Sequence, residues 1–342
     1  RRLPGFFSEK IGVPVYPFES PNFLPSAKNK QVNLVRSVAY NLFRLHKYLS
    51  SIRYINRMIK ETGADVVVNF YELLTGLTYL FCHPKALMVC IAHQYLFLHP
   101  DFVFPGQNRL SLVSLKFFTR MTAIGATKKL ALSFRKMREV PSERIVVVPP
   151  LLRKEVLETT PVNGDYLHGY LLNSGFSEEI RSWHKVHPNV ALHIFWDKKE
   201  VRPEVKVDSF LSFHQLNDTL FIRYMASAKA YATTAGFESV CEAMYLGKPV
   251  LMVPTHIEQS CNAFDAVQAG AGVVADRFDL DALLELSRTH RPNPAFSHWV
   301  KQADWLILRE FRPDLLMEET PASLWRRLST RWIYRLGKTL SI

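Results

Sequence analysis

The chain has 342 residues, of which 48% are hydrophobic and 22% are charged, and its formal net charge is +12. This length allows two ordinary domains with sizeable cores, and the composition excludes a disordered chain. No apolar run reaches about 18 residues, so the sequence predicts no transmembrane helix. The four cysteines form no C-x-x-C pair, and we expect them to be buried, reduced thiols of a cytoplasmic protein.

Most of the positive charge lies in the first half. Residues 1–150 contain 21 Lys/Arg against 8 Asp/Glu, whereas residues 151–342 contain 22 against 23. A one-sided positive field attracts anionic partners, such as an acidic membrane surface, nucleic acid or a phosphorylated substrate. A solvated basic face without any partner is the alternative. The basic runs lack interleaved aromatic residues, so we expect no nucleic-acid partner.

The first half predicts alternating helices and strands. Apolar residues at helical spacing predict one helix over 32–59. Continuous apolar runs predict strands over 64–70 and 86–93, and two more over 121–127 and 144–150. The chain opens at Arg1 without an initiator methionine, and we expect an N-terminal segment to precede it. We therefore predict an N-terminal domain over 1–150 that lacks its first strand and loop, followed by a polar linker over 151–164.

The second half repeats the alternation over 165–295, the predicted second domain. Strands are expected over 166–173, 190–196, 209–216, 229–234, 249–254 and 271–275. Strict βα alternation favours a parallel, doubly wound sheet. Residues 296–342 are expected to form helices and a basic tail that pack back on the N-terminal domain. The last part, 321–342, has leucines four residues apart beside five basic residues, which also suits a helix lying on an anionic membrane.

Small and polar residues follow three of the strands predicted in the second half, and each group leads into a helix. They stand in "NSG" after the first strand, in "TTAG" after "AYA", and in "THIEQ" after "LMVP". Ligands of open α/β sheets bind at the carboxyl ends of the strands, and helix N-termini suit phosphate oxygens. Glu242, six residues after Gly236, could accept both hydroxyls of a ribose.

The stretch "TTAGFESVCEAMYLGKPVLMVP" followed by "EQSCNA" resembles the donor-binding signature of GT-B glycosyltransferases. It is similar to the family-28-like group, which includes the peptidoglycan N-acetylglucosaminyltransferases, and to bacterial proteins known only as glycosyltransferases. The resemblance covers about residues 165–290 strongly and the first half moderately. It implies two doubly wound Rossmann-like domains that face a cleft, with the nucleotide-sugar donor in the second domain.

The resemblance also assigns residues to the donor site. Gly236 and Glu242 correspond to the diphosphate and ribose contacts, Glu258 and Gln259 to the contacts with the donor sugar and phosphates. The nucleobase would lie against the segment after the third strand of the domain. The full set of expected donor contacts is Asn173, Ser174, Gly175, Phe213, Gln215, Leu216, Thr234, Gly236, Glu242, His256, Glu258, Gln259 and Asn262.

The catalytic base is expected in the first half. The resembling families begin with a strand and a Gly-rich loop that contains a histidine, and this chain starts downstream of that loop. His93 and Glu72, which follow two predicted strands, are the remaining candidates, since a histidine pKa lies near neutrality. Both could equally be structural. No His/Cys/Asp set has zinc spacing and no D-x-D stands at a strand end, so we expect no metal and no other cofactor.

We therefore predict a glycosyltransferase that moves a sugar from a nucleotide-sugar, as the resemblance implies UDP-linked, to an anionic or lipid-linked acceptor hydroxyl. The resemblance further implies inversion without a metal ion. Such an enzyme is expected in the cytoplasm, peripherally on the inner face of the membrane. Two alternatives stay open: a non-enzymatic basic nucleic-acid or membrane binder with a dead nucleotide fold, and a nucleotide-sugar 2-epimerase. The acid-poor first half counts against the epimerase, which needs a carboxylate-rich cleft.

Overall fold

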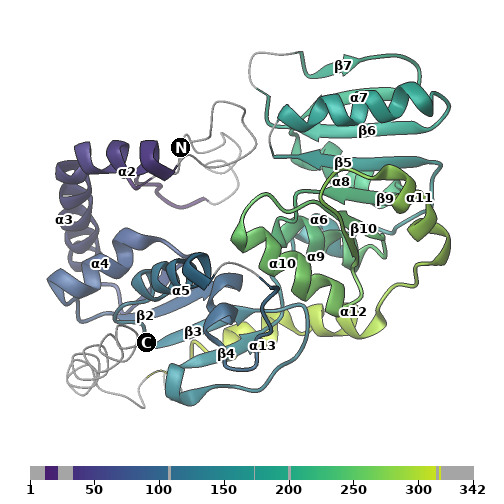
Figure 1. The fold of residues 1–342 in the computed structure, drawn as a ribbon. Coiled ribbons are helices and arrows are strands. Elements are labelled where there is room, and N and C mark those ends of the chain that lie inside the picture. The colour runs from purple at the N-terminus through teal and green to yellow at the C-terminus, as the bar shows by residue number, and fades with distance from the viewer. Residues whose placement is uncertain are drawn as a thin grey trace.

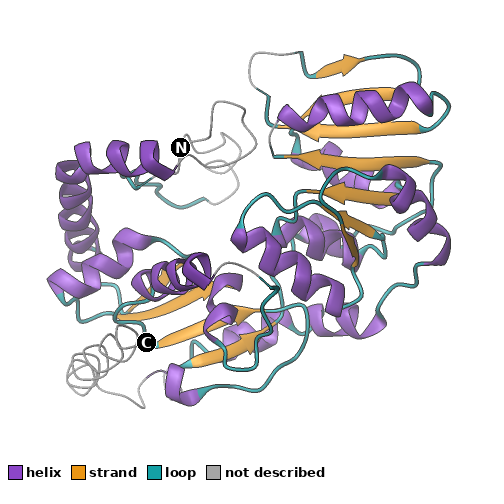
Figure 2. Ribbon diagram, in the orientation of Figure 1, coloured by secondary structure: helices purple, strands orange, loops and turns teal. Residues whose placement is uncertain are grey.

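The computed structural model describes residues 12–21, 34–106, 109–172, 174–198, 202–312 and 316. Within them the chain forms two α/β parts (Figure 1), each built around a sheet with helices packed against it (Figure 2). One sheet has four strands in the order β1-β2-β3-β4, and the other has seven in the order β11-β10-β9-β5-β6-β8-β7. The predicted pair of α/β domains is confirmed.

The first sheet is entirely parallel, with strands β1 (Val66–Asn69), β2 (Leu87–Ala92), β3 (Lys128–Leu132) and β4 (Ile145–Val148). Alternate residues of β2 face opposite sides, as a strand requires. Met88 and Cys90 share a core cluster with residues of α4 (Leu73–Cys82) and of the 3₁₀ helix η1 (His93–Leu98). α5 (Arg109–Thr122) packs against α4 on this side.

The opposite face of this sheet is covered by the end of the described chain. Val89 and Ile91 pack in one cluster with Ala303 and Ile307 of α13 (Ala303–Arg309). Just before it, Trp299 of α12 (Pro294–Val300) donates its ring N–H to the Ser133 carbonyl at 3.0 Å. The chain thus returns from the second domain to the first (Figure 1). Residues 317–342, which include the predicted basic helix, lie outside the described part.

Two predictions for the first half are wrong in detail. The helix expected over 32–59 is two helices, α2 (Leu34–Phe43) and α3 (Leu45–Glu61), which meet at a corner at Arg44 (Figure 1). The strand expected over 121–127 is the end of α5 and a turn at Gly125, whose φ is +80°. β3 follows it and opens with two lysines, which interrupt the apolar run that predicts a buried strand.

The second sheet carries the predicted alternation almost unchanged. Its strands are β5 (Tyr166–Leu171), β6 (Ala191–Trp196), β7 (Glu204–Lys206), β8 (Leu211–Gln215), β9 (Ala230–Thr233), β10 (Val250–Met252) and β11 (Gly272–Val274). The helices that follow strands are α7 (Ser177–Val186), α8 (Asp218–Ser227), α9 (Phe237–Tyr245), α10 (Ile257–Gln268) and α11 (Leu280–Thr289). β7 pairs with β8 in the antiparallel sense, so this edge departs from the expected all-parallel sheet.

The order of strands in the second sheet reverses at β5. From β5 the chain first builds outward through β6 and β8, and then crosses to the other side of β5 to form β9, β10 and β11. The loops after β5 and β9 therefore diverge from neighbouring strand ends. Such a reversal leaves a crevice at the carboxyl edge of an open sheet, which is where ligands bind in this architecture.

The connection between the domains belongs structurally to the second one. It contains the short helix α6 (Lys154–Leu157), whose Val156 is fully buried in the core beside α8 and α9. Further along, the Val162 N–H donates to the Ala226 carbonyl, and the buried Lys248 ammonium donates to the Val162 carbonyl. The predicted linker is thus fixed against the second domain. The short 3₁₀ helices η2 (Pro141–Glu143) and η3 (Ser174–Phe176) complete the described elements.

Candidate donor site

Of the five helices that follow strands of the second sheet, two have side-chain caps and three do not. Asn217 caps α8 and Asp279 caps α11. The N-cap positions of α7, α9 and α10 are occupied by Phe176, Gly236 and His256, and none of them makes a side-chain cap bond. The first N–H groups of a helix have no partner within the helix. Hence α9 and α10, which follow the adjacent strands β9 and β10, begin with uncapped, partially positive ends, whereas α7 continues directly from η3.

The turn after β9 is fixed by contacts on its buried side. Thr233 and Thr234 are buried, and Ala235 adopts a φ of +64°, which is strained for a residue with a Cβ. The Asn262 side-chain amide donates to the Ala235 carbonyl at 3.4 Å. A Cβ placed on Gly236 would meet only the Ser239 hydroxyl, at 3.7 Å. The turn is therefore fixed on its inner side and has room on its outer side.

Glu242 is buried in α9 and paired with an arginine from the domain connection. Its two carboxylate oxygens accept hydrogen bonds from Arg153 Nε at 2.6 Å and Arg153 Nη2 at 2.8 Å. Burial raises the pKa of Glu242, and the Arg153 guanidinium opposes that rise. Arg153 Nη1 also lies 3.6 Å from Asp218 Oδ1, at the start of α8. Sequence reasoning found Glu242 but missed Arg153.

The start of α10 places the next three predicted residues in different settings. His256 is exposed at the N-cap, whereas Gln259 is buried and its Oε1 accepts bonds from the Thr255 N–H and hydroxyl at 2.9 and 2.8 Å. Glu258 accepts a bond at 2.8 Å from Gln94, which belongs to the first domain. Burial raises the pKa of Glu258. Gln259 therefore shapes the loop after β10, and Glu258 lies where the two domains meet.

The predicted nucleobase contacts separate into buried and accessible residues. Phe213 is fully buried, its ring stacked on Trp196 with centroids 4.5 Å apart, so the prediction that it touches a ligand is wrong. The cause is that β8 is covered on both faces, since its residues 211–214 are all buried. Gln215 is half-buried and Leu216 is 50% exposed. Ser174 and Gly175 lie in η3 after β5, and Asn173 lies outside the described residues.

His93 lies in the contact between the domains and does not have the geometry of a base. Its ring is 2% exposed and stacks on Phe237, the first residue of α9, with centroids 3.9 Å apart. Its Nδ1 lies 2.7 Å from the Leu132 carbonyl, to which it donates. Burial lowers the pKa of His93 to about 4. His93 therefore packs against the start of α9, and its ring is enclosed by protein.

Glu72, the other predicted base, caps a helix. Its carboxylate accepts a bond from the Leu74 N–H at 3.0 Å at the start of α4, and a second from the Ser20 hydroxyl at 2.7 Å. These two bonds account for its position by ordinary N-capping. The structure therefore favours a structural role for Glu72.

A charged pair also joins the domains. Arg135, in the loop after β3, lies 3.0 Å from Asp265 Oδ1 on α10, and it donates a longer bond to Gln268. The Asp265 side chain is 1% exposed, and burial raises its pKa to about 6 although Arg135 opposes the rise. Neither residue was predicted, because their positions, 130 residues apart, carry no local signal.

The part of the chain that the structure describes contains no cluster of three or more His, Cys, Asp or Glu residues arranged to hold a metal ion. In the same residues, no helix combines the length and the apolar character needed to cross a bilayer. The four cysteines are free thiols, three of them buried.

Comparison with known proteins gives a consistent result. A family model, glycosyl transferase family 1, matches residues 22–286. A Caenorhabditis elegans protein with a provisional name as the UDP-glucuronosyltransferase ugt-48 is 30% identical over 111 residues, which is 31% of this chain and 19% of that protein. The chain therefore spans about a fifth of that relative.

Solved structures resemble the chain over most of its length. The glycosyltransferase of kitacinnamycin is 15% identical with a TM-score of 0.52, and the match covers 86% of each chain. The calicheamicin glycosyltransferase CalG4 is 16% identical with a TM-score of 0.49, over 85% of this chain and 83% of that one. At such low identity the likeness concerns the fold alone.

Proposed function

The chain belongs to glycosyl transferase family 1 and is a glycosyltransferase with a GT-B fold, and on that premise we propose that its second domain binds a UDP-sugar at the carboxyl ends of β5, β9 and β10. One observation carries the proposal: α9 and α10, the helices after β9 and β10, lack side-chain caps, whereas α8 and α11 of the same sheet have them. Uncapped helix ends offer N–H groups and positive potential to a diphosphate.

The remaining donor contacts follow from the positions around this site. The diphosphate lies at the turn before α9, where Gly236 leaves room, and Glu242 accepts the ribose hydroxyls. Gln215 and Leu216 flank the nucleobase, and Glu258 faces the sugar. The helix ends stabilise the leaving diphosphate, so the transfer needs no metal ion or other cofactor. That it proceeds with inversion rests on the family likeness alone. We base UDP on the family likeness, and the relative's name agrees with it.

Nucleotide binding tests this proposal. We expect UDP to raise the melting temperature of the wild type more than GDP, ADP or TDP does, and to raise that of Glu242→Ala less. Glu285→Ala is the matched control, because Glu285 also pairs with an arginine, Arg288 at 2.6 Å, but on the exposed surface of α11. The proposed site is refuted if no nucleotide stabilises the wild type. The ribose contact is refuted if UDP stabilises Glu242→Ala as much as Glu285→Ala.

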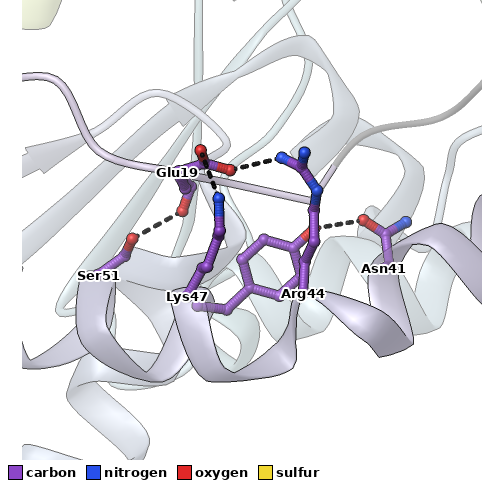
Figure 3. Close-up of polar contacts among 6 residues, drawn as sticks. Glu19, Asn41, Arg44, Lys47 and Ser51 are labelled. Atoms are coloured by element: carbon purple, nitrogen blue, oxygen red, sulfur yellow. Dashed lines mark hydrogen bonds and ion pairs between the residues drawn. The ribbon is translucent and has the colours of Figure 1, made fainter.

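We further propose that the acceptor is anionic or lipid-linked and is met at a membrane surface. Apolar side chains at the corner of α2 and α3 are exposed, with Phe43 84% exposed and Leu42 65%. Two basic residues, Arg44 and Lys47, lie next to them in the chain. Both bond Glu19, which ties the segment 12–21 to this corner (Figure 3). Exposed apolar side chains next to basic ones suit an anionic bilayer interface.

Vesicle sedimentation tests the membrane surface. We expect the wild type to sediment with vesicles containing phosphatidylserine and not with phosphatidylcholine alone, and Phe43→Ser to sediment less. Phe81→Ser is the control, because Phe81 is also exposed, at 61%, but lies on α4. Equal sedimentation of the two variants would contradict this placement of the membrane.

A further inference from the structure

The carboxylate that the donor is proposed to use is already bonded by the protein. Arg153 approaches Glu242 as a fork, with Nε on one oxygen at 2.6 Å and Nη2 on the other at 2.8 Å. The Glu242 side chain is 5% exposed and that of Arg153 is 36% exposed. The guanidinium therefore stands between the carboxylate and the solvent.

A forked arginine and a vicinal diol compete for the same two hydrogen-bond acceptors, the oxygens of a carboxylate. Each presents two donors, side by side, to its two oxygens, and the forked arrangement is the strong form of this interaction. The remaining surface of Glu242 is enclosed by the protein. The ribose hydroxyls thus cannot reach Glu242 while Arg153 holds both of its oxygens.

The Arg153 side chain can turn to another carboxylate, that of Asp218, without any movement of the domains. Its backbone is fixed to the donor domain, because its carbonyl accepts bonds from the Val156 and Leu157 N–H groups of α6. Only the side chain needs to turn. Its Nη1 already lies 3.6 Å from Asp218 Oδ1, and the Asp218 side chain is 38% exposed. Asp218 follows Asn217, the cap of α8, directly after the proposed nucleobase segment.

We propose that Arg153 is an intramolecular competitor of the nucleotide: it occupies Glu242 in the ligand-free protein, and ribose binding transfers its guanidinium to Asp218. The inference rests on the proposed function, since it concerns the ribose contact of that same site. The ribose hydroxyls replace the two hydrogen bonds that Arg153 makes to Glu242. Breaking those bonds costs free energy, which lowers the net affinity for the nucleotide. In return, Glu242 keeps its charge compensated when the site is empty.

Calorimetric titration with UDP tests the competition. Removing the competitor in Arg153→Ala is expected to lower the Kd up to about fivefold, the factor that corresponds to about 1 kcal/mol, the upper range for a partly exposed charged pair. Arg153→Lys keeps the cation but not the fork, so its Kd should fall between the two. Arg288→Ala, which removes the surface pair with Glu285, should bind UDP like the wild type.

A second substitution shows where the guanidinium goes. Asp218→Asn removes the landing place, so it should raise the Kd for UDP several-fold in the wild type and have no effect in the Arg153→Ala background. Thermal melting of each variant without ligand establishes that it is folded before titration. The non-additivity of the two changes separates a transfer from simple loss of charge.

The outcomes distinguish this inference from the function on which it rests. If the wild type binds UDP and both Arg153→Ala and Arg153→Lys bind it more weakly, Arg153 supports the site and the competition is refuted, while the proposed donor site stands. Equal effects of Asp218→Asn in both backgrounds would refute the transfer to Asp218. If neither the wild type nor Arg153→Ala binds any of the four nucleotides, the proposed function itself is refuted.

Discussion

Substituting the two residues of the ion pair between the domains, Arg135 and Asp265, should change the free energy of unfolding in opposite directions. Asp265 is 1% exposed, whereas Arg135 keeps 32% of its side chain in contact with solvent. Removing the charge of Asp265 leaves an arginine that water and Gln268 can still satisfy. Removing Arg135 instead leaves a buried carboxylate without its cation, which is the costly way to break such a pair. We therefore expect Asp265→Asn to stabilise the protein and Arg135→Ala to destabilise it.

The size of the effect follows from the pKa of Asp265, which rises from 3.8 in the unfolded chain to about 6 in the fold with Arg135 in place. A raised carboxyl pKa means that the folded state holds its proton longer, so stability is lost as the pH rises through this window. At 1.36 kcal/mol per pKa unit, the loss is about 1 kcal/mol at pH 4.5 and about 3 kcal/mol at pH 7.5. Asp265→Asn, which is neutral at every pH, should regain these amounts.

Urea denaturation at pH 4.5 and pH 7.5 measures both variants. The advantage of Asp265→Asn over the wild type should grow between the two pH values, and the deficit of Arg135→Ala should be larger at pH 7.5. Asp101→Asn is the control: Asp101 bonds Arg138 at 2.6 Å in an exposed pair, and its loss should change stability little. The reasoning fails if Asp265→Asn destabilises the protein at pH 7.5, or if its effect does not change with pH.

Two further predictions concern the cores. His168 is fully buried among aromatic rings, and burial lowers its pKa to about 3. Below pH 6.5 the unfolded chain binds a proton at this residue that the folded protein does not bind, so the stability of the wild type declines as the pH falls. His168→Phe should remove about 2 kcal/mol of that decline between pH 7.5 and pH 5 in urea melts, and an unchanged decline would refute this argument. Gly76 of α4 has no room for a side chain, because a Cβ there would lie on the Met121 carbonyl oxygen. Gly76→Ala should therefore cost about 2 kcal/mol or more by the same assay, whereas Gly106→Ala, in open space, should cost far less, and equal losses would contradict this packing argument.

The sequence was sufficient for the second domain because its signals are local. Continuous apolar runs identified its buried strands. Predictions from local patterns failed where tertiary packing determines the burial of a side chain or the boundary of an element. Phe213 lies in the expected segment, but β8 is covered on both faces and the ring is enclosed in the core. The helix break at Arg44 and the shift of β3 toward its two lysines depend on packing that no periodicity records.

The residues that sequence reasoning missed all act across long distances in the chain. Arg153 meets Glu242 from 89 positions away, and Arg135 meets Asp265 from 130 positions away. The sequence predicts that a charged side chain in a polar loop is solvated, and only the folded structure shows that its partner is buried. His93 is the converse case: its position after a strand suggested chemistry, whereas its ring is enclosed against Phe237.

The uncapped helices give a signal that a sequence could have supplied. Asn217 and Asp279 precede α8 and α11, and their side chains cap them. Gly236 and His256 stand at the same positions before α9 and α10 and make no cap bond. A good cap contributes about 1 kcal/mol, so its absence from the neighbouring helices α9 and α10 costs stability. A ligand that supplies the missing acceptors would recover that stability, which is why an anionic nucleotide should raise the melting temperature of this domain in particular.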